Sequence, residues 1–118
     1  MKFLVVDDSN IARKRLNSYL NELNYIVLGE AIDGLDAIDK FILLKPSIVA
    51  LDLEMPNLNG IDTAKRLLEI NPKVKIILIT SIIDKKEIIN AYRIGIKKVI
   101  TKPFSIEKLK ESIEEIKG

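Results

Sequence analysis

Short apolar runs of strand length alternate along this chain with longer segments in which apolar residues recur every three or four positions. An apolar run such as residues 48–51 predicts a strand buried on both faces of a sheet, and the longer period predicts helices that cover the sheet. We expect a helix after each strand. The expected strands are residues 2–7, 25–29, 48–52, 75–80 and 98–101.

Start and stop signals accompany the helical segments. Asp8 or Ser9 can cap the first helix, and Pro46 stops the second. Asp84 can cap the fourth helix, which Gly95 can end. The apolar residues expected to face the sheet are Ile11, Leu16, Leu20 and Leu23 in the first helix and Ile38, Phe41 and Ile42 in the second.

Strands that alternate with helices predict an α/β fold in which helices cover both faces of a parallel sheet. Right-handed crossovers leave few topologies, and five strands fit the flavodoxin-like doubly wound order 2-1-3-4-5. A length of 118 residues suits one domain. Because we see no linker, repeat or low-complexity segment, we expect a single domain over residues 1–118.

Polar side chains stand where four of the expected strands end. Asp7 and Asp8 come at the end of the first strand, and Asp52 ends the third. Thr80 ends the fourth strand and Lys102 follows the fifth. The carboxyl ends of parallel strands meet at one edge of the sheet, where open α/β folds bind ligands. The three carboxylates repel one another, and one lysine does not balance them, so the cluster calls for a further cation. This edge therefore predicts a metal-assisted phosphoryl site.

The composition narrows the choice of metal. The chain contains no cysteine and no histidine, so a metal here must be held by oxygen atoms. Oxygen ligands favour Mg²⁺, Mn²⁺ or Ca²⁺. An Mg²⁺ site needs one or two carboxylates, a backbone carbonyl, water and a phosphoryl oxygen, and the predicted edge can supply the protein's share of these ligands.

Charge and hydropathy exclude several classes of partner. The net charge is +2, with 19 basic and 17 acidic residues, and the lysines are scattered among acids with few aromatics nearby. We therefore expect no direct contact with nucleic acid. No apolar run reaches the roughly 20 residues that a membrane span needs, and no signal-peptide pattern begins the chain. These features predict a cytoplasmic protein without membrane insertion.

Four stretches occur in a specific order and spacing: Val5-Val6-Asp7-Asp8-Ser9, Leu51-Asp52-Leu53-Glu54-Met55-Pro56 with Gly60, Ile79-Thr80-Ser81, and Val99-Ile100-Thr101-Lys102-Pro103-Phe104. Thr80 stands 28 positions after Asp52, and Lys102 a further 22. In these features the chain resembles, over essentially its whole length, the receiver domain of bacterial and archaeal response regulators, the CheY-like family.

The resemblance implies a role for each residue at this edge. Asp52 would be the phosphoacceptor and would take a phosphoryl group from a sensor histidine kinase. Asp8 would bind Mg²⁺ directly and Asp7 largely through water. Asp52 itself and the backbone carbonyl of Glu54 would complete the protein's ligands. No organic cofactor is implied, and the protein would be a phosphoacceptor switch with only its own phosphorylation and dephosphorylation chemistry, not an enzyme.

The resemblance also describes the switch. Lys102 would pair first with Asp52 and then with its phosphoryl group, and a cis Lys102-Pro103 peptide bond would aim the lysine. Thr80 would turn its hydroxyl onto the phosphoryl oxygen. The surface of the fourth helix, fifth strand and fifth helix would then bind a downstream protein. The Asp-Asp-Ser start with Arg13 and the Leu-Glu-Met-Pro stretch favour chemotaxis, although Glu-Met-Pro also occurs in receivers attached to methylesterases.

Three positions depart from the family pattern. Val99 stands where an aromatic side chain usually moves inward with the threonine, so the switch is expected to be muted or to use other side chains. Ser81 replaces a common alanine and narrows the approach to Asp52. Ile82 and Glu54 flank the phosphoryl position, and an apolar Ile82 is expected to shield the phosphoryl group from water.

Two other functions fit parts of the pattern. A Mg²⁺-dependent phosphatase with an aspartyl nucleophile usually carries Asp-x-Asp on one strand and a cap region, whereas Asp8 is followed here by Ser9 and Asn10. A flavodoxin-like cofactor binder would need a loop rich in Ser, Thr and Gly after the first strand, and residues 7–10 do not provide one.

Overall fold

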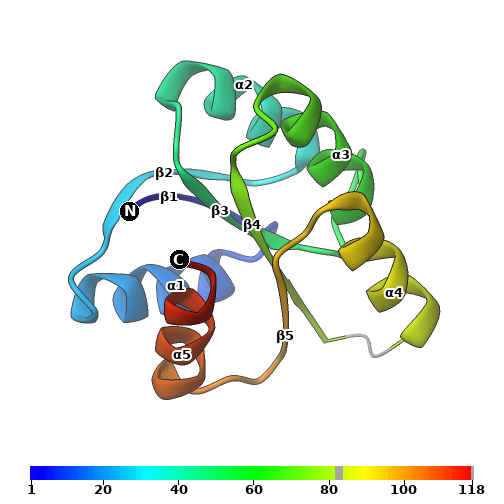
Figure 1. Cartoon of the computed structure of the whole chain (residues 1–118). Coiled ribbons are helices and arrows are strands. Elements are labelled where there is room, and N and C mark those ends of the chain that lie inside the picture. Colours follow the sequence, from blue (N-terminus) through cyan, green and yellow to red (C-terminus); the bar gives the residue numbers. More distant parts are fainter. Residues whose placement is uncertain (82–83, 118) are drawn as a thin grey trace.

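The computed structural model describes residues 1–81 and 84–117, so the expectation for Ile82 lies outside the described part. Strands and helices alternate through those residues (Figure 1). The strands are β1 (Lys2–Val6), β2 (Ile26–Ala31), β3 (Ile48–Asp52), β4 (Lys75–Thr80) and β5 (Lys98–Thr101). The helices are α1 (Asn10–Glu22), α2 (Gly34–Leu44), α3 (Gly60–Ile70), α4 (Lys85–Ile94) and α5 (Ile106–Lys117).

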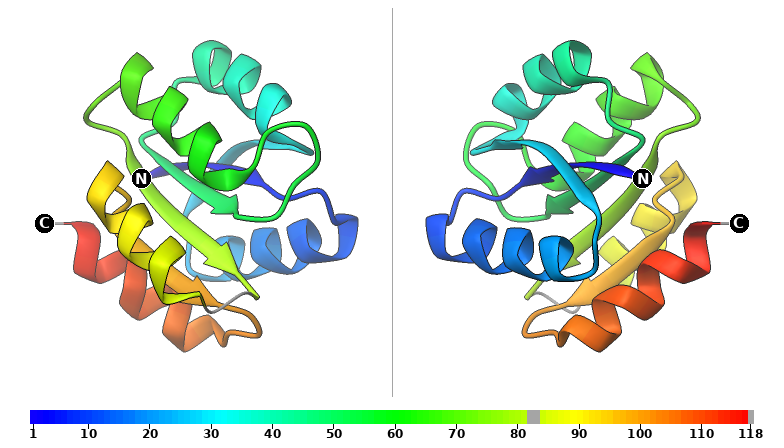
Figure 2. Two further views of the ribbon diagram at one scale, coloured as in Figure 1. Left: turned by 90° about the vertical axis from the view of Figure 1, so that its right-hand side faces the viewer. Right: turned by 90° about the vertical axis from the view of Figure 1, so that its left-hand side faces the viewer.

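The five strands form one parallel sheet in the order β2-β1-β3-β4-β5, which confirms the predicted fold class and topology. Helices α1 and α5 cover one face of the sheet, and α2, α3 and α4 cover the other (Figure 2). This arrangement brings the carboxyl ends of β1, β3, β4 and β5 to one edge of the molecule.

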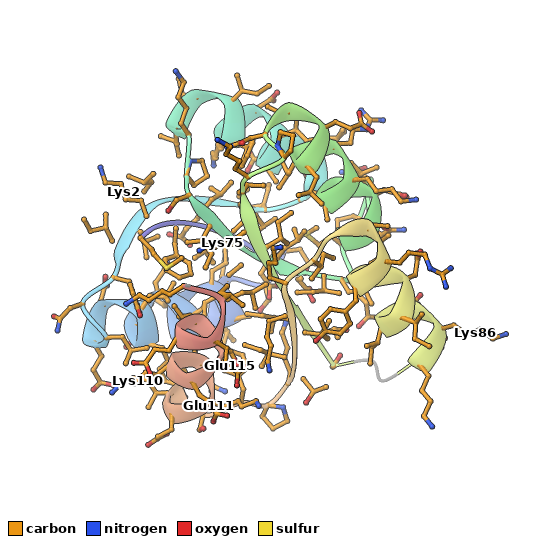
Figure 3. All side chains as sticks on the ribbon, in the orientation of Figure 1. Lys2, Lys75, Lys86, Lys110, Glu111 and Glu115 are labelled. Carbon is orange, nitrogen blue, oxygen red and sulfur yellow. The ribbon has the colours of Figure 1, made fainter. Side chains whose placement is uncertain are left out.

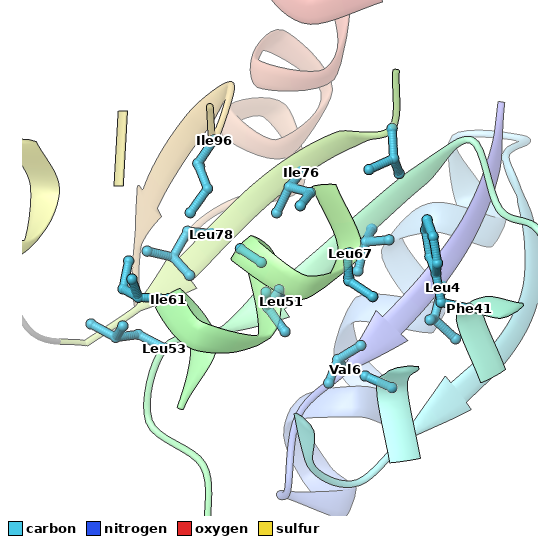
Figure 4. Packing of buried hydrophobic residues seen from close by; sticks show 14 of the residues in the cluster. Leu4, Val6, Phe41, Leu51, Leu53, Ile61, Leu67, Ile76, Leu78 and Ile96 are labelled. Atoms are coloured by element: carbon cyan, nitrogen blue, oxygen red, sulfur yellow. The ribbon is translucent and has the colours of Figure 1, made fainter. Parts of the chain in front are cut away.

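Central strand β3 is buried along its whole length, and its residues alternate between two hydrophobic clusters. Val49 and Leu51 pack with α2, α3 and α4 (Figure 4 shows this cluster), whereas Ile48 and Ala50 pack with α1 and α5. Each fully buried large side chain stabilises the fold by roughly 1.5–3 kcal/mol relative to its exposed state. Asp52 therefore ends a strand that two packed layers hold in place.

Polar caps fix where the helices begin and end. The Ser9 side chain accepts a hydrogen bond from the Ala12 backbone N–H, so Ser9, and not Asp8, is the N-cap of α1. Asp84 caps α4 as predicted, through the Lys86 N–H. Gly95 ends α4 at a φ of 113°, a left-handed conformation that glycine adopts without steric cost.

Two residues predicted to face the sheet point outward instead. Ile11 is 76% exposed and Ile42 is 55% exposed. Ile11 lies five positions before the buried Leu16, which turns it about 140° around a helix of 3.6 residues per turn. Ile42 lies about 100° past Phe41, the centre of the buried face of α2. The boundaries predicted for the second strand, residues 25–29, also lie too close to the N-terminus, since the strand spans Ile26–Ala31.

Candidate functional site

The predicted site residues meet at one edge of the sheet. Asp7 directly follows β1, Asp52 ends β3, Thr80 ends β4 and Lys102 directly follows β5. Asp7, Asp52 and Thr80 are buried, at 6%, 7% and 1% exposure, whereas Asp8 is exposed. One carboxylate oxygen from each of the three aspartates lies within 4.8 Å of the other two. Such a set of hard oxygen donors fits Mg²⁺.

Lys102 contacts two of these acids. Its Nζ lies 2.9 Å from Asp7 Oδ2 and 3.6 Å from Asp52 Oδ1, so the lysine is closer to Asp7 than to its predicted partner Asp52. The Lys102-Pro103 peptide bond is cis, as predicted. The Lys102 backbone N–H donates to the Thr80 carbonyl at 2.8 Å, which ties the lysine's loop to the end of β4.

Burial and neighbouring charges shift the pKa values of Asp52 and Lys102. Burial, followed by the neighbouring Asp7, raises the pKa of Asp52 from 3.8 to about 6, although Lys102 acts in the opposite direction. Burial disfavours the charged form of Lys102, but its hydrogen bond to Asp7 and its proximity to Asp52 outweigh that effect and raise its pKa. A cation bound between the carboxylates would relieve the strain on Asp52, which agrees with a metal site.

Gly60 lets the first turn of α3 pass close behind Asp52. A Cβ atom on Gly60 would lie 2.5 Å from the Asp52 carbonyl oxygen and 2.7 Å from Leu53 Cα. The Gly60 N–H donates to the Leu53 carbonyl at 2.8 Å. Only glycine permits this approach, which fixes the backbone that carries Asp52.

Two hollows flank the carboxylates. One cavity of about 410 Å³ runs from Asp52 between α1 and the loop after β5, and its walls include Ala12, Leu16, Pro103 and Phe104. A second hollow of about 410 Å³ is lined by the acids Asp8, Glu54 and Glu87 and by apolar residues that include Leu53, Met55 and Ile61. The Ser81 hydroxyl donates to Glu54 Oε1 at 3.3 Å, so the residue predicted to narrow the approach to Asp52 contacts one of the two residues predicted to flank the phosphoryl group.

Sequence reasoning missed several polar contacts around this edge. Arg13 donates to the Asp7 carbonyl and to the carboxylate of Glu30. At the edge strand β5, the Tyr92 hydroxyl accepts a hydrogen bond from the Val99 backbone N–H at 3.1 Å. An aromatic ring from α4 therefore lies beside the strand position at which the sequence lacks one. The seven-residue separation of Tyr92 and Val99 offered no signal, because a helix end and a turn lie between them.

The sequence model of the response regulator receiver domain matches residues 3–114. This chain belongs to the response regulator receiver family. It is 37% identical to protein CcdB of Bacillus subtilis over 117 residues, which cover 99% of this chain and 98% of that protein. It is 36% identical to the chemotaxis protein CheY of Thermotoga maritima over 115 residues, covering 98% and 96%.

Among solved structures, the CheX–CheY–BeF3–Mg²⁺ complex from Borrelia burgdorferi contains a chain with the same fold. Its TM-score is 0.95 at 24% identity, and the match covers 98% of this chain and 88% of that chain. Receivers are the regulatory modules of two-component signalling, and that general role follows for this chain from its family membership and its CheY relatives.

The surface of the receiver carries mixed charge. Three lysines from different elements lie at separate places on the molecule: Lys2, Lys86 and Lys110 (Figure 3). Acidic residues accompany the last of them, since α5 carries Glu111 and Glu115 as well as Lys110. None of the helices in the described ranges is long and apolar enough to cross a membrane.

Proposed function

We propose that this receiver is a phosphorylation-controlled switch in which Asp52 accepts a phosphoryl group from a sensor histidine kinase with the help of Mg²⁺. The observation that carries the proposal is the cluster around Asp52. Its carboxylate lies with those of Asp7 and Asp8 in a group whose ligand atoms are within 4.8 Å of one another, and Lys102 Nζ is 3.6 Å away.

The residues divide the work of phosphoryl transfer. Asp7, Asp8, Asp52 and the Glu54 carbonyl would hold Mg²⁺, which supplies positive charge to the oxygens of the transferred group. An Asp52 oxygen attacks phosphorus, an O–P bond forms, and the N–P bond of the donor's phosphohistidine breaks. The leaving imidazole nitrogen keeps the electron pair of that bond.

The ionisation state of the site suits this reaction. Because the pKa of Asp52 is about 6, its carboxylate is mostly ionised at neutral pH and is available as a nucleophile. Lys102 remains protonated, since its pKa is raised, and its ammonium can follow the new phosphoryl charge. The buried Thr80 hydroxyl stands at the end of the neighbouring strand, and we assign it as a phosphoryl hydrogen-bond donor.

The output surface is the face of α4, β5 and α5, through which a downstream protein would bind. A relative of similar length is a CheY chemotaxis protein, which supports a role in chemotaxis. We propose that residues 1–118 act as one such domain. The new phosphoryl group adds charge and acceptor oxygens that bias Thr80 and Lys102 between two positions.

Acetyl phosphate tests the proposal. After incubation with Mg²⁺, mass spectrometry of the intact protein should show one added phosphoryl group. Asp52→Asn and a chelator should each prevent the addition, whereas Asp39→Asn, which changes an exposed aspartate of α2, should not. Wild-type protein that stays unmodified would refute the proposal. Steady turnover of an external phosphomonoester would instead indicate the phosphatase alternative.

A further inference from the structure

The nearly buried side chain of Arg13 joins three elements beside the acidic cluster. The side chain is 11% exposed and belongs to α1. Its Nη1 donates to the Asp7 backbone carbonyl at 2.7 Å, and its Nε donates to Glu30 Oε1 at 3.0 Å. Its Nη2 donates to the Asn10 side-chain oxygen. One guanidinium thus connects the end of β1, the end of β2 and the first turn of α1.

The Asp7 carbonyl is a critical point for the geometry of the site. Residues 7–9 lie between β1 and α1 and belong to neither. The peptide unit between Asp7 and Asp8 is planar, so holding its carbonyl oxygen also fixes the nitrogen and Cα of Asp8. Arg13 therefore sets the point from which the Asp8 side chain starts.

Asp8 depends on its backbone more than the other two acids do. Asp7 is buried and held through its side chain by the Ser9 N–H at 2.9 Å and by Lys102 at 2.9 Å. Asp52 is buried at the end of β3. Asp8 is exposed, so its place in the cluster rests on the turn that presents it.

We propose that Arg13 is a positioning residue for the divalent cation. Through the Asp7 carbonyl it holds Asp8 within reach of Asp7 and Asp52. The inference rests on the proposed function, because it assumes that these three acids bind Mg²⁺. Partners that orient a metal ligand typically change metal affinity by about tenfold to a hundredfold when they are removed.

The direction of the effect separates this role from simple electrostatics. Arg13 is a cation close to a cation-binding site, so its charge alone weakens Mg²⁺ binding. If charge were its only influence, Arg13→Gln would bind Mg²⁺ more tightly than wild type. A positioning role requires the opposite result, because glutamine cannot bridge the three acceptors.

Isothermal titration with MgCl₂ tests the proposal, at a temperature at which circular dichroism shows every variant folded. We expect the Mg²⁺ dissociation constant of Arg13→Gln to rise about tenfold or more. The control Arg15→Gln removes the same charge from an exposed arginine on α1, and it should bind Mg²⁺ as tightly as wild type or more tightly. An Arg13→Gln affinity equal to or above wild type would overturn the inference.

Arg13→Lys keeps the charge but replaces the planar fork with one compact donor group. We expect an affinity between those of wild type and Arg13→Gln. If Arg13→Gln does not fold, Arg13→Lys decides alone, and wild-type affinity in that variant would overturn the inference. Absence of Mg²⁺ binding by wild type would instead refute the proposed metal site, and acetyl phosphate labelling would show whether Asp52 still accepts a phosphoryl group.

Discussion

Lys102 Nζ lies 2.9 Å from Asp7 Oδ2 but 3.6 Å from Asp52 Oδ1, so in this state the ammonium group is hydrogen-bonded mainly to Asp7. Charge-assisted hydrogen bonds are short and strong, and of the two contacts only the one to Asp7 has the usual length of such a bond. A phosphoryl group on Asp52 would compete with Asp7 for the Lys102 ammonium group. A bound cation would take over the neutralisation of Asp7 and let the lysine shift toward the phosphoryl group.

Replacing Lys102 should therefore separate metal binding from phosphorylation. In Lys102→Met, Mg²⁺ should bind at least as tightly as in wild type, because a competing cation is gone. Phosphorylation by acetyl phosphate should slow by about a hundredfold or more, the typical cost of removing one donor that stabilises transferring charge. Calorimetry and time-resolved mass spectrometry measure the two effects.

Lys98→Met is the matched control for Lys102→Met. Lys98 also forms an ion pair, with Glu115, but it stands at the opposite end of β5. Lys98→Met should leave the Mg²⁺ affinity and the rate of phosphorylation near their wild-type values. Equal phosphorylation rates in the two variants would contradict the role given to Lys102.

The raised pKa of Asp52 predicts how stability depends on pH in the metal-free protein. Between pH 3.8 and about 6 the folded state keeps a proton on Asp52 that the unfolded state has lost. The contribution of Asp52 to stability therefore falls as pH rises through this window, by about 3 kcal/mol in total, and is constant above it.

Urea unfolding with a chelator, compared between wild type and Asp52→Asn, isolates this contribution. The asparagine variant should gain stability over wild type progressively from pH 4 to pH 6 and keep the gain at pH 7. A difference between the two proteins that does not vary with pH would rule out the raised pKa.

Mg²⁺ should stabilise the folded protein in proportion to the logarithm of its concentration. At a hundred times the dissociation constant the gain is about 2.7 kcal/mol, provided that the unfolded chain binds no metal. Thermal unfolding with increasing MgCl₂ measures the gain. Asp8→Asn should greatly reduce it, whereas Asp39→Asn on α2 should not, and an equal gain in both variants would argue against the acidic cluster as the metal site.

Gly60→Ala should disturb the site from behind. The added methyl would press on backbone atoms of Asp52 and Leu53, which cannot move aside as a flexible side chain could. We expect a loss of about 1–3 kcal/mol in unfolding free energy, together with slower phosphorylation. In Gly29→Ala the methyl meets only the end of the Leu44 side chain, at 2.7 Å, so a smaller loss is expected there. Denaturant unfolding of both variants compares the two costs.

Tyr92→Phe should loosen the outer edge of β5. It removes the hydroxyl that accepts from the Val99 N–H at 3.1 Å, at a cost of about 0.5 kcal/mol, because Tyr92 is half exposed and water can replace the oxygen. Hydrogen exchange at the Val99 amide should become faster. Tyr19→Phe, on α1, should leave that amide unchanged, and equal exchange in the two variants would show that the hydroxyl does not protect it.

The fold and the composition of the site could be predicted because both follow from local rules. A buried strand that ends in Asp52 and another that is followed by Lys102 reach the same edge once the sheet is parallel. The inward face of α1 does not follow from its apolar residues alone. Ile11 is apolar but exposed, and the helical period places Arg13 closer to the buried side of α1.

Contacts between long polar side chains could not be predicted in the same way. Arg13 reaches Glu30 near the end of β2, and the position of Glu30 depends on the register of β1 and β2, which shifts between Phe3 and Leu4. The preference of Lys102 for Asp7 over Asp52 is a difference of 0.7 Å (3.6 Å against 2.9 Å) between two contacts that the sequence describes equally well.

The alternation of β3 between two hydrophobic clusters has a practical meaning for engineering this receiver. A repacking substitution beneath α1 and α5, or beneath α2, α3 and α4, meets the same five-residue strand and so can displace Asp52 from either side. Libraries of variants designed to change signalling should therefore sample positions from both hydrophobic clusters. Segments exchanged between homologues to redirect signalling are best chosen among the outer helices, with Ile48–Asp52 and its neighbours left intact.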